Sequence, residues 1–104
     1  MPVTRKLAVK AGSVDEGDKH TVLIVDDSGM SRMMLRNILE DAGYCIVAEA
    51  SDGLEGELAY KQYAPDVVTL DITMPNMDGI ELIKHIYKEN PNQKIIVLSA
   101  HNES

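Results

Sequence analysis

The sequence predicts an α/β domain built on a parallel sheet, and three features of its pattern point to this fold class. Short apolar, β-branched runs that suit buried strands alternate with stretches whose apolar residues recur at helical spacing. Clusters of turn-forming residues separate the two kinds of segment. Two of the strand-like runs end directly in carboxylates. The resulting βαβαβαβ order is typical of a doubly wound sheet with helices on both faces.

Four segments are predicted to form the strands of this sheet. Each is short, rich in Val, Ile or Ala, and bounded by polar or turn residues, as strands buried on both faces tend to be. The predicted strands are residues 21–25, 45–50, 67–71 and 94–99.

Three helices are predicted between these strands, and their ends carry stop and start signals. Ser28 and Ser31 both suit the N-cap of the first helix, Gly43 suits its left-handed C-terminal end, and Pro65 ends the second helix. We expect the apolar positions at helical spacing to face the core. They are Met34, Leu35, Ile38, Leu39 and Ala42 in the first helix, Leu54, Leu58, Ala59 and Tyr63 in the second, and Ile80, Ile83, Ile86 and Tyr87 in the third.

The charge of the chain is acidic and unevenly distributed. Its 104 residues carry a net charge of −7, yet residues 1–20 hold four basic and three acidic side chains. Residues 21–104 therefore hold six basic and fourteen acidic ones, a balance of −8. Direct nucleic-acid binding needs a basic face, so this balance argues against it and favours a cation site or a basic protein partner. We expect residues 1–20 to be a flexible leader and residues 21–104 to form one domain.

Cysteine content and hydropathy bound the compartment. Cys45 is the only cysteine, so no intramolecular disulfide can form and a reducing compartment is expected. Its surroundings in the sequence favour a buried structural thiol. No apolar run approaches the roughly 18 residues of a membrane span, and residues 1–20 lack the apolar stretch of a signal peptide. A cytoplasmic location is therefore predicted.

Acidic residues follow the first predicted strand and end the third. Asp26 and Asp27 come directly after the first strand, and Asp71 ends the third. If the two strands are neighbours in a parallel sheet, the three carboxylates converge at its carboxyl edge, where open α/β sheets bind their ligands. Repulsion among three such anions needs an offsetting cation or protons. Oxygen ligands favour a hard divalent cation, most simply Mg²⁺.

Each of these residues also has a plain structural interpretation. Asp26 and Asp27 suit a helix N-cap with a dipole-favourable neighbour, and Asp71 suits a loop cap. A carboxylate is also a nucleophile towards phosphorus, and phosphoryl transfer asks mainly for alignment and charge neutralisation. Ser99 ends the fourth strand at the same edge, where its hydroxyl suits either a phosphoryl contact or an ordinary strand end.

Three motifs in order carry a resemblance to a known family. The runs VLIVDDS, PDVVTLDITMPNMDGIELI and KIIVLSA resemble the receiver domain of bacterial and archaeal two-component response regulators. The sequence around DITMPNMDG and LSA is most similar to the stand-alone, CheY-like chemotaxis type. The resemblance covers residues 21–100 and implies a flavodoxin-like fold, with the four strands here in the order 2-1-3-4.

The resemblance implies a role for each site residue. Asp71 would accept the phosphoryl group from the phospho-His of a histidine kinase. Asp26, Asp27 and Asp71 would bind Mg²⁺ together with the backbone carbonyl of Thr73. Ser99 would be the switch hydroxyl that moves to the phosphoryl group. Such a protein is a phospho-accepting regulator rather than an enzyme acting on an external substrate.

The chain departs from the family after its fourth strand. Family members continue with a fourth helix, a fifth strand and a fifth helix, and that stretch carries a Lys that pairs with the phosphoryl group. Here the chain stops at Ser104, which makes it a C-terminally truncated receiver by this reading. An exposed fourth strand predicts a homodimer or segment swap through its edge, in which case the chain is an interaction module. A phosphatase with an aspartyl nucleophile would need a second acid at position 73, which is Thr.

Overall fold

The computed structural model describes residues 20–71 and 79–98, and within them strands and helices alternate as predicted. The expected leader, apart from residue 20, lies outside the described residues. Helix α1 begins after the N-cap Ser28 and is followed by Gly43 in the left-handed region at φ 99°. The elements are β1 (Thr21–Val25), α1 (Gly29–Asp41), β2 (Cys45–Ala50), α2 (Gly53–Tyr63), β3 (Val67–Asp71), α3 (Gly79–Glu89) and β4 (Lys94–Leu98).

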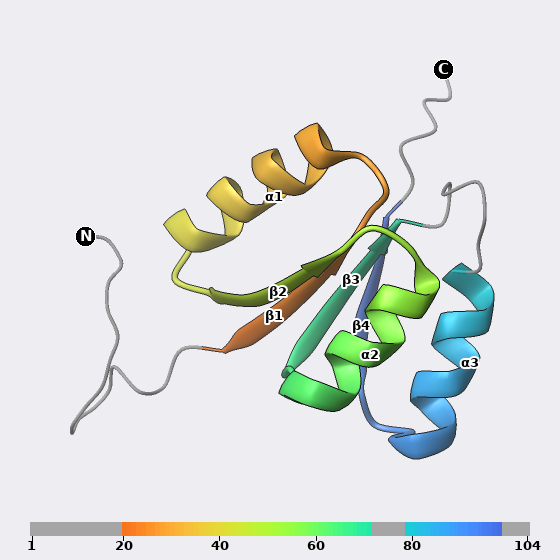
Figure 1. The fold of residues 1–104 in the computed structure, drawn as a ribbon. Helices are drawn as coiled ribbons and strands as arrows, with labels where there is room; N and C mark the ends of the chain where they lie inside the picture. The colour runs from red at the N-terminus through yellow and green to blue at the C-terminus, as the bar shows by residue number, and fades with distance from the viewer. Residues whose placement is uncertain (1–19, 72–78, 99–104) are drawn as a thin grey trace, which may run out of the picture.

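The four strands form one parallel sheet in the order β2-β1-β3-β4, which confirms the predicted fold class. Helix α1 covers one face of the sheet, and α2 and α3 lie side by side on the other (Figure 1). All the strands therefore point their carboxyl ends to the same edge, which is the edge that follows β1 and β3. Within the described residues, none of the helices is long and apolar enough to cross a membrane.

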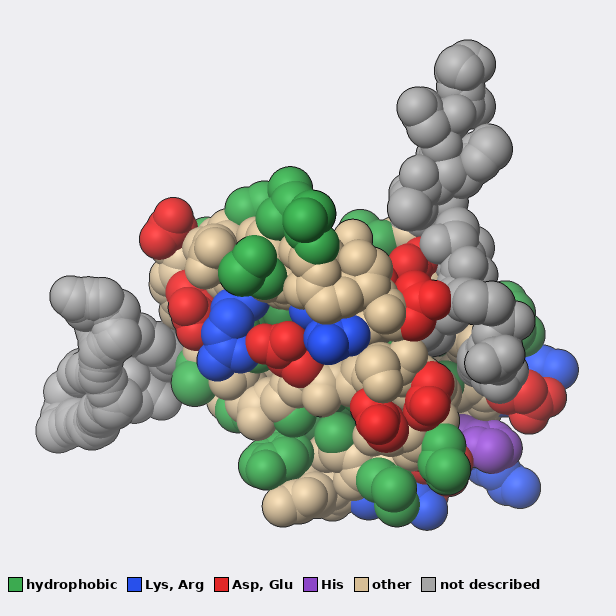
Figure 2. Space-filling view, turned by 45° about the horizontal axis from the view of Figure 1, so that its top comes forward, with side chains coloured by type: hydrophobic (Ala, Val, Ile, Leu, Met, Phe, Trp, Pro, Cys, Tyr) green, Lys and Arg blue, Asp and Glu red, His purple; other side chains and the backbone are tan. Residues whose placement is uncertain are grey.

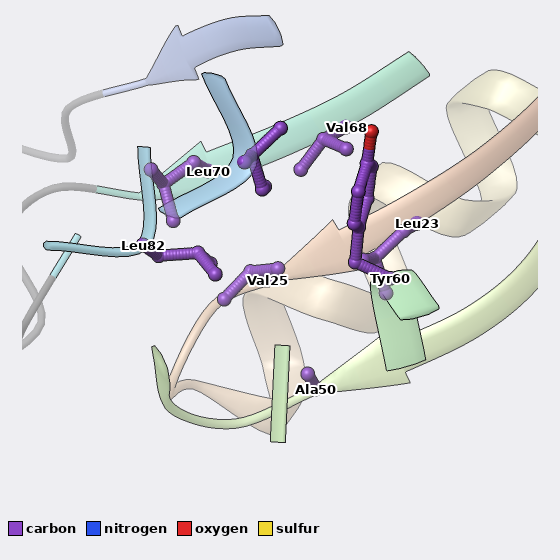
Figure 3. Close-up of a cluster of buried hydrophobic side chains, with 8 residues drawn as sticks. Leu23, Val25, Ala50, Tyr60, Val68, Leu70 and Leu82 are labelled. Carbon is purple, nitrogen blue, oxygen red and sulfur yellow. The ribbon is translucent and has the colours of Figure 1, made fainter. Parts of the chain in front are cut away.

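The core consists of two apolar layers, one on each face of the sheet. Alternate residues of β1 divide between them: Leu23 and Val25 face α2 and α3, whereas Val22 and Ile24 face α1. Figure 3 shows the larger layer, in which side chains from β1, β3 and the two helices converge. Its buried members are Leu23, Val25, Ala50, Tyr60, Val68, Leu70, Leu82 and Ile86.

Helix α2 packs closely on this layer because Gly56 faces it. A Cβ atom at Gly56 would lie 2.9 Å from Leu82 Cδ2 and 3.3 Å from Val25 Cγ2, closer than side-chain atoms normally approach. The absence of a side chain thus sets how near α2 comes to both β1 and α3. One turn further along the helix, Tyr60 fills the remaining space and donates its hydroxyl hydrogen to Gln93 Oε1 at 2.8 Å.

Several side chains lie elsewhere than the pattern predicted. Met34 and Ile38 are 56% and 61% exposed, because α1 turns Leu35 and Leu39 towards the sheet and leaves their apolar neighbours on the flank. Leu54 and Leu58 of α2 are also exposed. The expectation of a buried thiol at Cys45 is wrong: the residue begins an edge strand and is exposed. Of the helix-three positions, Ile80 and Tyr87 are exposed as well.

Candidate functional site

The register of the sheet brings Asp26 next to Asp71. Val25 of β1 is paired with Leu70 of β3, so the residue that follows each is also a neighbour across the two strands. Adjacent strands are about 4.8 Å apart, and paired residues point to the same face. The Asp26 amide continues the sheet by donating to the Ala50 carbonyl of β2 at 3.0 Å. The predicted convergence of acids at the carboxyl edge therefore follows directly from strand pairing.

Asp27 completes a cluster of three carboxylates. One oxygen from each of Asp26, Asp27 and Asp71 lies within 4.8 Å of the others. Asp26 and Asp71 are only 8% and 6% exposed, whereas Asp27 is exposed. The structure thus confirms that the three acids meet, and it orders them as two buried carboxylates with an exposed one beside them.

Ionising all three carboxylates of the cluster is unfavourable, and the pKa of Asp26 is raised as a result. Burial raises the pKa of Asp26 above its ordinary value, and the negative charges of Asp71 and Asp27 raise it further. A hydrogen bond from the Ser28 amide to Asp26 Oδ1, 2.9 Å long, acts in the opposite direction. The net effect favours a proton or another positive charge at this carboxylate.

The residues present fit a magnesium ion. Mg²⁺ prefers hard oxygen ligands at about 2.1 Å, so two of its ligands lie at most about 4.2 Å apart. The 4.8 Å limit on the carboxylate oxygens is within a small side-chain rotation of that spacing. The raised pKa of Asp26 agrees with this fit, because a divalent cation offsets the negative charge that burial and the neighbouring carboxylates disfavour.

The turn between β1 and α1 is ordered by short-range hydrogen bonds. Ser28 is the N-cap of α1, and its Oγ accepts a hydrogen bond from the Ser31 amide at 3.2 Å. The Ser28 amide in turn donates to Asp26 Oδ1. Of the two serines that suited the cap, Ser28 is the one used. Asp26 and Asp27 therefore lie just before the N-terminus of α1, whose positive dipole end favours negative charge.

Sequence reasoning missed a basic side chain beside the acids. Arg32, in the first full turn of α1, donates from Nη1 to the backbone carbonyl of Asp26 at 2.7 Å and from Nε to Glu49 Oε1 of β2 at 3.2 Å. Arg36 holds the other oxygen of Glu49. Figure 2 shows basic side chains on either side of an acidic one on this face. The helical spacing of two arginines after the acids was the available signal.

Two further predicted residues, Thr73 and Ser99, lie outside the described residues. The proposed metal contact of the Thr73 carbonyl and the switch role of the Ser99 hydroxyl therefore stay predictions. β3 ends at Asp71 and β4 at Leu98, and these two residues are paired in the sheet. The carboxyl end of β4 thus lies beside the acid that ends β3.

Comparison with known proteins shows the family of the chain. Residues 22–104 match the response regulator receiver domain family. The chain belongs to this family. The match includes both acid-bearing strand ends and so agrees with the motifs on which the resemblance rested. A receiver is a component of two-component systems and acts as a regulator rather than as a classical enzyme.

Curated relatives place this receiver near the chemotaxis type. It is 56% identical to chemotaxis protein CheY of Thermotoga maritima over 79 residues. The aligned region covers 76% of this chain and 66% of that protein. The chain is 47% identical over 81 residues to CheY of Bacillus subtilis, covering 78% and 68%. The chain spans about two thirds of the length of the curated relatives it matches.

Solved structures agree with the fold. The receiver matches the crystal structure of the CheX–CheY–BeF3–Mg²⁺ complex from Borrelia burgdorferi with a TM-score of 0.75 and 40% identity, over 82% of this chain and 65% of that one. It matches the response regulator domain of Thermotoga maritima CheB with a TM-score of 0.73 and 40% identity, over 83% and 64%. Both likenesses are consistent with a chemotaxis-type regulator.

Proposed function

We propose that this receiver accepts a phosphoryl group on Asp71 from the phospho-His of a histidine kinase, with Mg²⁺ bound at Asp26, Asp27 and Asp71. The observation that carries the proposal is the cluster of three carboxylates at the carboxyl edge of the sheet. The cluster lies in a family of signalling regulators, and one of the matched structures is a Mg²⁺ complex. The Thr73 carbonyl and the Ser99 hydroxyl complete the proposed site as a metal ligand and a switch.

The three acids divide the work of the transfer. A carboxylate oxygen of Asp71 attacks phosphorus, the P–N bond to the donor imidazole breaks, and its electron pair leaves with the imidazole. Asp26 and Asp27 hold the metal, and Asp26 is itself oriented by the Ser28 amide. The bound Mg²⁺ supplies charge neutralisation for the phosphoryl oxygens. Phosphorylation then biases a pre-existing equilibrium between two receiver conformations.

The proposed setting rests on the relatives of the chain. The donor is a cytoplasmic histidine kinase, and the signal is of the chemotaxis type, as in the CheY relatives. The net charge of −7 suits a partner with basic residues around its phospho-His. A phosphatase reading has no second acid at position 73 to support it.

A small phosphodonor tests the proposal directly. Incubation with phosphoramidate, whose P–N bond resembles that of phospho-His, is expected to add the mass of one phosphoryl group when Mg²⁺ is present. A chelator should suppress the adduct because the buried acids then repel the incoming anion. Intact mass spectrometry measures both arms. A protein that stays unmodified at saturating donor and Mg²⁺ contradicts the proposed function.

Self-association is a second candidate function, and β4 is the observation that favours it. β4 pairs with β3 on one side and, among the described residues, with no strand on the other. Ile96 and Val97 are 47% and 48% exposed on opposite faces of this strand. Light scattering on residues 1–104 is expected to give a mass that rises with concentration towards that of a dimer, and Ile96→Lys should lower this mass. A constant monomer mass rejects this function.

A further inference from the structure

Arg32 joins the turn that carries the acids to the neighbouring strand. Its backbone amide donates to the Ser28 carbonyl at 3.0 Å and so helps to close the first turn of α1. Its side chain then folds back towards the start of the helix, as helical side chains do, and donates to the Asp26 carbonyl at 2.7 Å. The side chain is only 23% exposed, so this contact is largely shielded from competing water.

The carbonyl that Arg32 contacts belongs to the peptide bond between two of the acids. A peptide unit is planar, so the Asp26 carbonyl and the Asp27 amide share one plane. Fixing that carbonyl limits rotation on both sides of the plane, about ψ of Asp26 and φ of Asp27. The contact therefore constrains how the Asp27 side chain is presented relative to the buried Asp26 carboxylate.

The other end of Arg32 is anchored in the sheet. Arg32 Nε donates to Glu49 Oε1 at 3.2 Å, and the second oxygen of Glu49 is held by Arg36. Glu49 lies in β2, where it is paired with Ile24 of β1. A planar guanidinium presents several donors in a fixed fork, so it can hold two acceptors at once at a set angle. The anchor thus transmits the rigidity of the sheet to the turn.

From these contacts we infer that Arg32, anchored by Glu49, is a positioning residue that presets the peptide plane between Asp26 and Asp27 for the divalent cation. This inference rests on the proposed function, because it concerns the same site. It extends that function from the acids to a residue that touches neither the metal nor the phosphoryl group. Outer partners that orient metal ligands commonly change metal affinity about 10–100-fold when removed.

Charge alone would act in the opposite direction. A guanidinium near a cation site repels the cation, so deleting it should strengthen Mg²⁺ binding if electrostatics were its whole contribution. Deleting a positioning contact should weaken the binding. The direction of the change therefore separates the two roles.

Arg36 offers a matched control. It lies one turn further along α1, carries the same charge and pairs with the same Glu49, and also with Glu40 at 3.3 Å. Among the described contacts it has none with Asp26. Arg32→Ala and Arg36→Ala thus remove the same group from the same helix, but only the first frees the peptide plane.

Isothermal titration with Mg²⁺ tests the inference. We expect Arg32→Ala to bind Mg²⁺ about tenfold more weakly than the wild type, and Arg36→Ala to stay within about twofold. Arg32→Lys keeps the charge and the stem but has no fork, so it should also bind more weakly, and it serves if the alanine variant is poorly folded. Unchanged or tighter binding in both Arg32 variants, or equal weakening in Arg36→Ala, overturns the inference.

Hydrogen exchange in the Mg²⁺-free protein keeps this test separate from the proposed function. The Ser28 amide, which donates to Asp26 Oδ1, should exchange faster in Arg32→Ala than in Arg36→Ala. If the wild type itself fails to bind Mg²⁺, the proposed function is wrong, and the exchange comparison still decides whether Arg32 orders the turn. Equal exchange in the two variants contradicts the positioning role.

Discussion

Replacing Asp71 with asparagine is expected to abolish the phosphoryl adduct, whereas replacing Asp27 should only slow its formation. Asparagine has nearly the same shape as aspartate but lacks the nucleophilic carboxylate, so no acyl phosphate can form at position 71. In the proposed function Asp27, the exposed member of the cluster, is a metal ligand and not the acceptor. Loss of the Asp27 carboxylate weakens Mg²⁺ binding and leaves the acceptor Asp71 in place.

Intact mass over a time course of phosphoramidate and Mg²⁺ measures this difference. Asp71→Asn should stay at its starting mass. Asp27→Asn should form the same adduct as the wild type at a rate at least about tenfold lower. Asp41→Asn is the matched control, because it removes an exposed carboxylate from the last turn of α1, away from the cluster, and should react like the wild type. An adduct on Asp71→Asn that matches the wild type would place the acceptor elsewhere.

The strand pattern predicted the site because its geometry follows from strand ends. Asp26 and Asp71 each come directly after a buried apolar run, and a parallel sheet must bring such ends to one edge. The order of the strands rested on the family motifs and is confirmed. Short apolar runs bounded by turn residues were enough to define the four strands, although only β1 and β3 are largely buried.

Helix faces were predicted less well, because hydrophobicity does not reveal which flank touches the sheet. Leu54 and Leu58 look like core residues at helical spacing, yet α2 turns Gly56 and Tyr60 inward. Gly56 has no apolar side chain to signal its place, and its importance arises from close contact with Leu82. A count of apolar positions cannot detect a contact made by the absence of a side chain.

Long-range polar pairs also escaped prediction. The Arg32–Glu49 contact joins residues that only the fold brings together, across α1 and β2. Gln93 is another case: its amide donates to the Asp66 carbonyl at 2.9 Å and accepts from Tyr60, tying the start of β4 to the loop before β3. The partner of an arginine or a glutamine cannot be predicted from the sequence alone, because both residue types are commonly solvent-exposed.

Replacing Asp26 with asparagine is expected to stabilise the Mg²⁺-free protein at neutral pH and to destabilise it relative to the wild type when Mg²⁺ is saturating. Burial, followed by the charges of Asp71 and Asp27, raises the pKa of Asp26. Its ionised form is therefore disfavoured by folding. Asparagine is neutral and can still accept the hydrogen bond from the Ser28 amide through Oδ1.

The sign of the pH dependence follows from the raised pKa. A carboxyl group with a raised folded-state pKa contributes stability that is fully present below its unfolded pKa, close to 3.8, and is lost as pH rises through the folded value. The advantage of Asp26→Asn should thus be largest near pH 7 and disappear as pH falls towards 3.8. Glu55 and Glu57 have lowered pKa values, through Ser51 and His85 respectively, and act in the opposite direction in both proteins. Comparing the two proteins at each pH removes that shared contribution.

Urea unfolding followed by far-ultraviolet circular dichroism measures the difference, since the chain has no tryptophan. In chelator the variant should unfold at higher urea than the wild type. With Mg²⁺ at about 100 times its dissociation constant, the wild type should gain about 2.7 kcal/mol by mass action, while the variant gains less because it lacks a ligand. The order of stability reverses where this difference in gain exceeds the advantage of the variant in chelator. If the variant is no more stable in chelator, ionising the buried Asp26 carboxylate beside Asp71 and Asp27 does not destabilise the fold, which contradicts the prediction.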